Sequence, residues 1–203
     1  MIDERIYQQF VEIGRDLYEH QMISSHGGNL SLRFADKVII KRRGAMLGRL
    51  KPHDLIETGL DKNDSGVALA STELIVHRAI YKATPALAVV HAHPRTAIAL
   101  SLSRDEIVPI DNEGSYLLKK VPVVAVEMAS GSPQMAQAVS EALKEYKAIM
   151  LRGHGSFAIG QTLDEAFFWT STLEECSQII LTARLIGEPF IEYRRMSEAY
   201  GKW

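Results

Sequence analysis

The chain has 203 residues, 46% of them apolar, which is enough for one well-filled domain, and its formal net charge of −2 argues against nucleic acid as the main partner. No run approaches the ~20 apolar residues of a membrane span, the N-terminus has no apolar signal core, and a single cysteine excludes an internal disulfide. We therefore expect one domain over residues 1–203, in the cytoplasm and without a membrane partner.

Hydrophobic periodicity and turn residues predict the elements of the first half of the chain. Residues 2–20 carry apolar side chains at three- and four-residue spacing, which is typical of a helix with one apolar face. A polar loop with two glycines follows over 24–29. After it we expect strands over 30–34 and 37–41, a strand over 54–60, a solvated turn over 61–66, and a helix from about 70 to 82 that ends before Pro85.

The second half continues the alternation of strands and helices. Ser132 followed by Pro133 is an N-cap with proline in the first helical position, and Thr162 with Glu165 forms a capping box. Because short turns join most strands, we predict a single α/β domain with a largely antiparallel or mixed central sheet and helices on both faces. The expected strands are 87–93, 106–110, 121–126, 148–151 and 156–159, and the expected helices are 96–102, 132–146 and 162 to a stop at Gly187.

A pair of histidines follows the apolar run over 87–90. His91 and His93 are two residues apart, so on an extended backbone both imidazoles lie on the same face. Pro94 then ends the strand, since it has no N–H to donate. Two imidazoles directed to one side provide half of a metal site, although two histidines held by ordinary hydrogen bonds would show the same spacing.

Two further residues can complete such a site. His154 lies in Gly153-His154-Gly155, a tight turn that directs the ring outward, and Glu73 opens an amphipathic helix. Three histidines and one carboxylate suit a divalent transition ion, zinc above all, in a site that can open one position to substrate. Glu73 and His77, one helical turn apart, form a competing pair. We assign His77 to packing or to support of the ligands, because the other histidines already complete a tetrahedral set with Glu73.

These motifs occur in one order with consistent gaps, and together they resemble the class II aldolase/adducin family. The likeness extends from Ile2 to about Gly187, and within the family the length and motif positions are most similar to those of the L-fuculose-phosphate aldolases. The resemblance is carried by Gly28 with Asn29-Leu30-Ser31, Gly44, Ser71-Thr72-Glu73, His91-Ala92-His93 and Gly153-His154-Gly155.

The resemblance implies one zinc ion per chain, or another divalent ion in its place, and a phosphate pocket beside it. Ser71 and Thr72 support the pocket, because free N–H groups and the dipole at a helix N-terminus favour an anion. The implied metal ligands are His91, His93 and His154, with Glu73 as a fourth ligand or a base. The implied phosphate residues are Gly28, Asn29, Gly44, Ser71 and Thr72.

The implied reaction is the zinc-dependent cleavage of a small phosphorylated ketose, of the L-fuculose 1-phosphate type, to dihydroxyacetone phosphate and an aldehyde such as lactaldehyde. The ion acts as a Lewis acid on the ketose oxygens, and Glu73 moves the proton. Two other reactions fit the same site: 4-epimerisation of the ribulose 5-phosphate type, with Asp111 as proton carrier, and methylthioribulose-phosphate-type dehydration, with Glu113 or Glu73 as base. The intact ligand set argues against a non-catalytic binding module, as in adducin.

The sequence departs from the family pattern at two places near the expected phosphate pocket. Arg42-Arg43 stands where a hydroxyl residue commonly precedes Gly44, and His26 stands where threonine is common. The two arginines can bind a phosphate or carboxylate, or face solvent or a neighbouring subunit.

The resemblance also implies a homotetramer with four-fold cyclic symmetry and the active site near a subunit interface. A neighbour's zinc would then receive acid groups from the segment with Asp111, Glu113 and Tyr116, and from the tail with Tyr193 and Tyr200; which of them is the acid stays open. The helix from residue 163 independently favours association, because its apolar width exceeds one amphipathic stripe. A fully buried core helix is the alternative.

Overall fold

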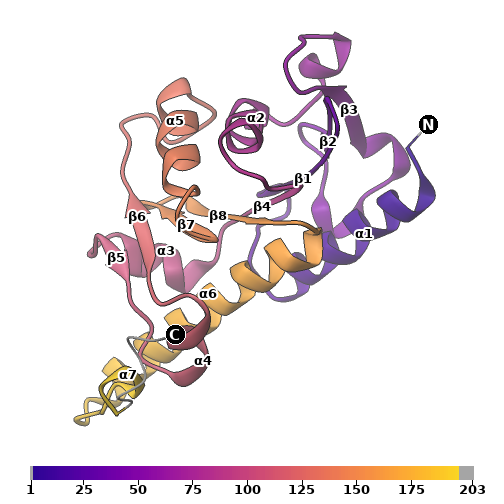
Figure 1. Cartoon of the computed structure of the whole chain (residues 1–203). Helices are drawn as coiled ribbons and strands as arrows, with labels where there is room; N and C mark the ends of the chain where they lie inside the picture. The colour runs from indigo at the N-terminus through magenta and orange to yellow at the C-terminus, as the bar shows by residue number, and fades with distance from the viewer. Residues whose placement is uncertain (1, 197–203) are drawn as a thin grey trace.

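An eight-stranded mixed sheet runs through residues 2–196, the part of the chain that the computed structural model describes (Figure 1). The strand order is β3-β2-β1-β4-β8-β7-β6-β5, and neighbouring strands are antiparallel except β6 and β7, which are parallel. The predicted mixed, mainly antiparallel sheet is confirmed. The strands are β1 Asn29–Phe34, β2 Lys37–Lys41, β3 Leu55–Gly59, β4 Ala88–Ala92, β5 Glu106–Ile107, β6 Val121–Val124, β7 Ala148–Leu151 and β8 Gly155–Gly160.

Helices cover both faces of the sheet, as predicted. Helices α2 and α5 lie on one face, while α1, α3 and the long α6 lie on the other; α4 packs against the middle of α6, and α7 lies near the C-terminal end of α6 (Figure 1). No helix within residues 2–196 is long and apolar enough to cross a membrane. The helices are α1 Glu4–Glu19, α2 Leu74–Ala83, α3 Arg95–Ser101, α4 Asn112–Leu117, α5 Pro133–Ala142, α6 Leu163–Ile186 and α7 Tyr193–Met196, with short 3-10 turns at Leu47–Arg49, Pro52–Asp54 and Ser65–Ala68.

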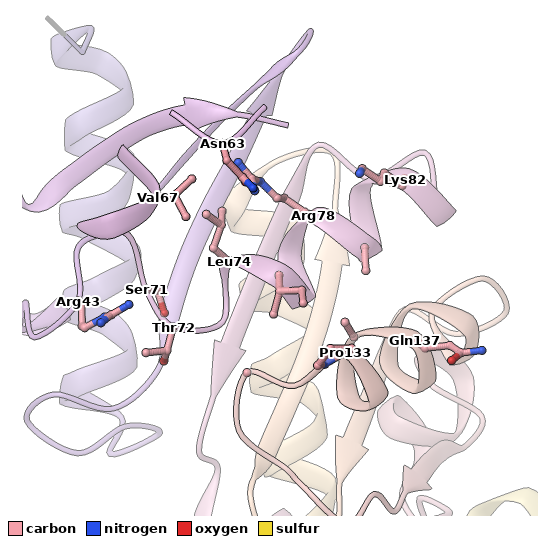
Figure 2. Close-up of a pocket in the computed structure, with 14 residues that line it drawn as sticks. Arg43, Asn63, Val67, Ser71, Thr72, Leu74, Arg78, Lys82, Pro133 and Gln137 are labelled. Atoms are coloured by element: carbon pink, nitrogen blue, oxygen red, sulfur yellow. The ribbon is translucent and has the colours of Figure 1, made fainter. Parts of the chain in front are cut away.

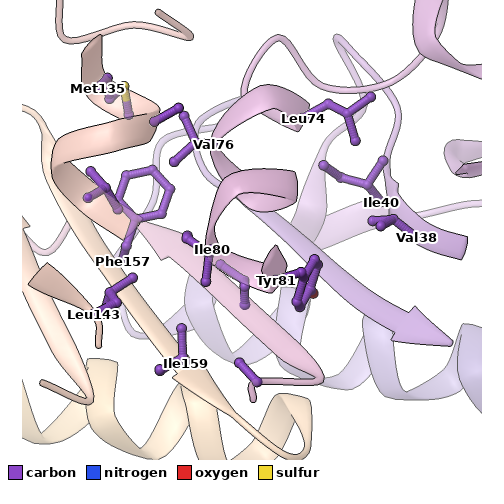
Figure 3. Packing of buried hydrophobic residues seen from close by; sticks show 14 of the residues in the cluster. Val38, Ile40, Leu74, Val76, Ile80, Tyr81, Met135, Leu143, Phe157 and Ile159 are labelled. Atoms are coloured by element: carbon purple, nitrogen blue, oxygen red, sulfur yellow. The ribbon is translucent and has the colours of Figure 1, made fainter. Parts of the chain in front are cut away.

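The hydrophobic core is divided by the sheet. Val38 and Ile40 of β2 contact the cluster beneath α2 and α5, whereas Ile39 between them contacts the cluster beneath α1 and α6. From α2, Val76 and Ile80 fill the first cluster (Figure 3). A third cluster joins α3 and the second half of α6 to the β5–β6 edge.

Strand β4 occupies the centre of this arrangement. All of its residues are buried, which explains why its sequence reads as a continuous apolar run. It pairs with β1 on one side, where Asn29 lies opposite His91, and with β8 on the other, where Phe157 lies opposite His91. The middle of the sheet therefore fixes the position of the first predicted ligand.

The structure corrects three details of the prediction. The helix expected over 132–146 ends at Ala142, because the next residues form a turn. The extended segment over 106–110 pairs only at Glu106–Ile107. Helix α4, for which no element was predicted, begins after Asp111, whose carboxylate accepts a hydrogen bond from the Gly114 amide and caps it.

Candidate metal and phosphate site

His91 is held on both sides within the core. Its Nδ1 lies 2.9 Å from the carbonyl oxygen of Ser156, and its ring stacks on Phe157 with the centroids 4.2 Å apart. Nδ1 therefore carries the proton and Nε2 keeps its lone pair, which is the state a metal ligand needs. Burial, with smaller contributions from His93 and His154, holds the pKa of His91 well below its usual value.

His93 lies just beyond the end of β4. Its backbone N–H donates to the carbonyl of Met22 at 2.6 Å, and its Nε2 lies 3.1 Å from Nε2 of His91. Burial lowers the pKa of His93 as well. Gly155 has to be glycine here, since a Cβ atom would lie 2.8 Å from His93 Cδ2 and 3.0 Å from His91 Cε1.

His154 completes the set from the β7–β8 turn. Gly153 has φ +68°, a left-handed conformation that glycine adopts without strain, and the turn brings the His154 ring to 4.9 Å from His91 and 5.2 Å from His93, measured between centroids. One nitrogen from each of the three rings fits within 4.8 Å of the others. Three imidazoles gathered this closely can hold a divalent metal ion.

Glu73 lies against this cluster as the N-cap of α2. It is buried, with Oε2 3.2 Å from His91 Nε2 and Oε1 3.7 Å from His154 Nε2. Asn29 Nδ2 donates to Oε2 at 2.8 Å. The structure thus brings together all four residues that the sequence analysis assigned to the metal.

A buried hydrogen-bond chain holds Glu73 from behind. Asn29 Oδ1 faces Nε2 of His77, Nδ1 of His77 lies 2.6 Å from Ser31 Oγ, and that hydroxyl lies 2.6 Å from the Tyr81 hydroxyl. Burial lowers the pKa of His77 to about 3, so the ring is neutral. Because Asn29 Oδ1 only accepts, Nε2 of His77 carries the proton, and each group donates one step toward Glu73. His77 therefore supports the cluster and is not part of it.

The predicted phosphate residues line the same cavity as the histidines. The cavity has a volume of about 220 Å³. Within residues 2–196, the backbone amides of Gly28, Gly44 and Thr72 have no hydrogen-bond acceptor, and both glycines have positive φ, at +69° and +73°. Residues with unpaired amides that line one cavity suit an anion. The walls include Gly28, Asn29, Gly44, Ser71 and Thr72; Figure 2 shows the last two beside Arg43.

Ser71 differs from the other phosphate residues because its backbone amide is already used. It donates to the carbonyl of Lys41 at 3.0 Å, and the Ser71 hydroxyl accepts from the Glu73 amide at 3.3 Å. Only the hydroxyl hydrogen of Ser71 is left for a ligand.

Four positively charged or ionisable side chains near this pocket have different roles. Arg42 turns away and pairs with Asp54 at 3.0 Å, whereas Arg43 and His26 line the cavity. Lys41 also lines it and is buried, which the sequence analysis missed. The available signal was a lysine that directly follows three apolar residues in a strand.

The candidate acids lie elsewhere in the chain. Asp111 and Glu113 line a separate cavity with Phe168 and Cys176, on the α4–α6 side of the molecule. Tyr116 lies in α4 and Tyr193 in α7, and neither lines the cavity with the histidines; Tyr200 lies outside the described residues. Within the described residues, one chain alone therefore does not bring Asp111, Glu113, Tyr116 or Tyr193 to the cavity.

The chain is similar to proteins of known families over most of its length. Residues 8–181 match the model of the class II aldolase and adducin N-terminal domain. An L-fuculose phosphate aldolase of Methanocaldococcus jannaschii is 31% identical over 180 residues, covering 88% of this chain and 97% of the relative. A 3-oxo-tetronate 4-phosphate decarboxylase of Haemophilus influenzae is 32% identical over 189 residues, covering 90% of each chain.

Solved structures show the same similarity. The crystal structure of L-fuculose-1-phosphate aldolase from Thermus thermophilus superimposes with a TM-score of 0.87 at 41% identity, covering 93% of this chain and 100% of that one.

Proposed function

This chain belongs to the class II aldolase and adducin family and is an enzyme of its aldolase type, and on that premise we propose that it cleaves a small phosphorylated ketose, of the L-fuculose 1-phosphate type, in a zinc-dependent retro-aldol reaction. The products are dihydroxyacetone phosphate and an aldehyde such as lactaldehyde. One observation carries the proposal: three clustered histidines and Glu73 line the same cavity as three residues whose backbone amides are unpaired.

The proposed metal ligands are His91, His93 and His154, with Glu73 as a fourth ligand or a base. Their side chains fit a zinc ion, because one nitrogen from each ring lies within 4.8 Å of the others, and the Nε2 atoms of His91 and His154 lie 3.2 Å and 3.7 Å from the Glu73 carboxylate. When bound, the ion supplies Lewis-acid stabilisation of the negative charge that carbon–carbon cleavage leaves. Glu73, which Asn29 orients, carries the proton at the carbon next to the ketone.

The amides of Gly28, Gly44 and Thr72, with Asn29 and the Ser71 hydroxyl, form the proposed phosphate cradle. Holding the phosphate fixes the distance between the reacting carbons and Glu73, which lies in the same cavity. The cradle therefore contributes orientation, and Glu73 contributes the proton transfer.

We further propose a homotetramer in which Asp111, Glu113 or Tyr116 of one subunit serves the cavity of another. Supporting this, these residues lie away from their own cavity, and α6, against which α4 packs, exposes large apolar side chains, among them Phe168 at 41%, Leu185 at 77% and Ile186 at 65%. Two expectations stay predictions: that residues 1–203 form one domain, and that the enzyme acts in the cytoplasm.

Decarboxylation of a phosphorylated 3-oxo sugar acid is the second candidate. Loss of carbon dioxide from a β-keto acid leaves the same kind of carbanion next to a carbonyl as aldol cleavage does, but it requires no group to take a proton from a leaving-group hydroxyl. Within the described residues, the cavity of a single chain contains none of Asp111, Glu113 and Tyr116, the groups proposed to exchange that proton, which favours this alternative, and one relative is named as such a decarboxylase.

A product analysis tests the proposal. The zinc-loaded protein is incubated with L-fuculose 1-phosphate, related ketose phosphates and 3-oxo-tetronate 4-phosphate, and dihydroxyacetone phosphate, aldehyde and carbon dioxide are measured. We expect aldehyde and dihydroxyacetone phosphate in equal amounts from a ketose. Carbon dioxide from the keto acid without aldehyde from any ketose would favour decarboxylation. An epimer, or a dehydrated product with an intact carbon skeleton, would identify the two other reactions.

A further inference from the structure

Helix α3 lies between two of the proposed metal ligands. It begins two residues after His93, packs between β7 and α6, and ends against the β7–β8 turn that carries His154 (Figure 1). The contact with the turn is close, since a Cβ atom on Gly153 would lie 3.2 Å from Leu102 Cδ2. The C-terminal end of α3 can therefore determine where the third histidine lies.

Ser101, the last residue of α3, joins the helix to this turn. It is fully buried, its hydroxyl donates to the carbonyl of Ile98 at 2.7 Å, and the Gly153 amide donates to the same hydroxyl oxygen at 3.0 Å. No backbone carbonyl within residues 2–196 accepts from the Gly153 amide. The Ser101 hydroxyl is thus the acceptor for the residue that directly precedes His154.

Arg152 provides a second bond between the turn and the end of α3. Its guanidinium donates to the Ser101 carbonyl at 2.9 Å and to the Asp105 carboxylate at 2.6 Å. The turn also has an internal bond, from the His154 amide to the carbonyl of Leu151 at 3.0 Å. That bond sets the shape of the turn, whereas the two bonds to Ser101 set its position relative to α3.

We propose that Ser101 is a positioning residue that holds His154 in the histidine cluster through the Gly153 amide. The inference rests on the metal ligands of the proposed function. Nδ1 of His91 is held by the Ser156 carbonyl, but Nδ1 of His154 has no hydrogen-bond partner within the described residues. Because no such bond orients the His154 ring, the backbone of the turn has to place it.

Zinc binding tests this without depending on catalysis. The dissociation constant of zinc is measured for the native chain and Ser101→Ala by competition with a chromophoric chelator, under conditions in which both are folded. The substitution leaves the Gly153 amide without its acceptor, so the turn is held less firmly. We expect zinc to bind about 10- to 100-fold more weakly, as is usual when a group that orients a metal ligand is removed.

Ser103→Ala is the matched control. Ser103 is exposed, and its hydroxyl also donates to a carbonyl three residues earlier, that of Leu100 at 3.4 Å, so this bond stays within the end of α3. Zinc affinity should be unchanged in this variant. Urea unfolding of the metal-free proteins measures general stability separately, because a merely structural Ser101 would lower that stability without changing the zinc affinity of the folded chain.

A double-mutant cycle tests whether Ser101 acts through His154. His154→Ala retains the other two histidines and Glu73, so its weaker zinc binding is measured with a chelator of lower affinity. Adding Ser101→Ala to this variant should cause no further loss, because the ligand that Ser101 positions is already absent.

Three results would overturn the inference: unchanged zinc affinity in folded Ser101→Ala, an equal loss in Ser103→Ala, or an equal loss from Ser101→Ala with and without His154. Absence of zinc binding by the native chain would overturn the proposed metal site as well. If no ketose is cleaved but Ser101→Ala still loses zinc affinity, the proposed reaction fails and this inference stands.

Discussion

Asn29 links the two halves of the candidate site through one side-chain amide. Its Nδ2 donates to Glu73 and its Oδ1 accepts from His77, so neither end of the amide is free to rotate. The same residue lines the cavity beside the unpaired amides. Its first role is therefore to fix the carboxylate of Glu73, in addition to the phosphate contact expected from the sequence.

Asn29→Asp should separate these roles. The new carboxylate would lie within hydrogen-bonding distance of Glu73, and repulsion between them should move Glu73 or force it to take up a proton. We expect kcat to fall by at least about tenfold, corresponding to a lost hydrogen bond to a charged group. Steady-state kinetics checks this, with Asn63→Asp, outside the cavity with the histidines, as control. An unchanged kcat in Asn29→Asp would show that Glu73 does not depend on Asn29.

His77 should make the stability of the metal-free protein sensitive to acid. Burial lowers the pKa of His77 to about 3 from the usual 6.5. Between these values the unfolded chain binds a proton that the folded chain does not. The free energy of unfolding should therefore be fully retained above about pH 6.5 and fall toward pH 3, by up to about 1.4 kcal/mol per pH unit for this group.

Urea unfolding measured across this pH range checks the prediction. In His77→Gln the free energy of unfolding should depend less steeply on pH than in the native chain, by the equivalent of up to one bound proton. His53→Gln should show no such change, because the His53 side chain is 69% exposed. Equal slopes for the native chain and His77→Gln would contradict the assignment of His77 as a neutral, buried group.

Helix α3 follows the first two histidines of the cluster in the chain. A residue of helix α6 caps the N-terminus of α3. Helix α3 begins two residues after His93, and its N-cap, Pro94, has no side-chain hydrogen bond to offer. Instead, the buried carboxylate of Glu174 in α6 accepts from the amides of Thr96 at 3.1 Å and Ala97 at 3.0 Å. The negative charge also suits the positive end of the α3 dipole.

Glu174→Gln should therefore destabilise the protein. The substitution removes the charge and replaces one acceptor oxygen by a donor that faces backbone N–H groups. We expect a loss of about 1–3 kcal/mol in the free energy of unfolding. Denaturant titration measures it, and Glu175→Gln, an exposed neighbour on α6, should cost much less. Similar values for the two variants would mean that the cap contributes little.

Elements with local signals could be predicted from the sequence. Ser132-Pro133 and Thr162 do begin α5 and α6, and Gly187 ends α6 with φ +75°. Helix α4 could not be found, because Asn112 and Gly114 within it are typical of turns and its stability depends on packing against α6. The strand order was also out of reach, since β4 pairs with β1 and β8, which are distant in the sequence.

The candidate site likewise contains residues that local sequence patterns predict and residues that only the folded chain brings together. His91, His93, His154 and Glu73 were found because their spacing and turn residues carry the information locally. Lys41 was missed because its burial depends on Ser71 and His26, which other segments supply. The separation of Asp111 from the histidines likewise depends on how α4 packs, which no local pattern shows.

At the scale of the whole molecule, the proposed tetramer should share its sites between subunits. On α6, Leu173 and Ile180 are buried but Phe168 and Leu181 are each 41% exposed, so the fully buried helix considered from the sequence is wrong. The exposed apolar surface of α6, against which α4 packs, would give a second subunit a place to bind.

Mixing inactive variants checks the shared site. His93→Ala chains should lack the metal, and chains with Asp111→Asn, Glu113→Gln and Tyr116→Phe should lack the acid. Mixed oligomers should regain activity, because at some interfaces an intact metal site of one chain then meets the intact acid groups of another. If every mixture stays inactive while each variant folds and exchanges subunits, or if the active protein is a monomer, the acid has to come from the same chain.

The proposed cleavage of a phosphorylated ketose would require a metal ion held by His91, His93 and His154, which would supply Lewis-acid stabilisation of the developing negative charge. Zinc is added stepwise to the metal-free protein while release of dihydroxyacetone phosphate from L-fuculose 1-phosphate is recorded. The account predicts no cleavage without metal, a linear rise to a plateau at one zinc per chain, and no response in His93→Ala. Full cleavage by the metal-free protein, or equal activity of His93→Ala, would contradict it.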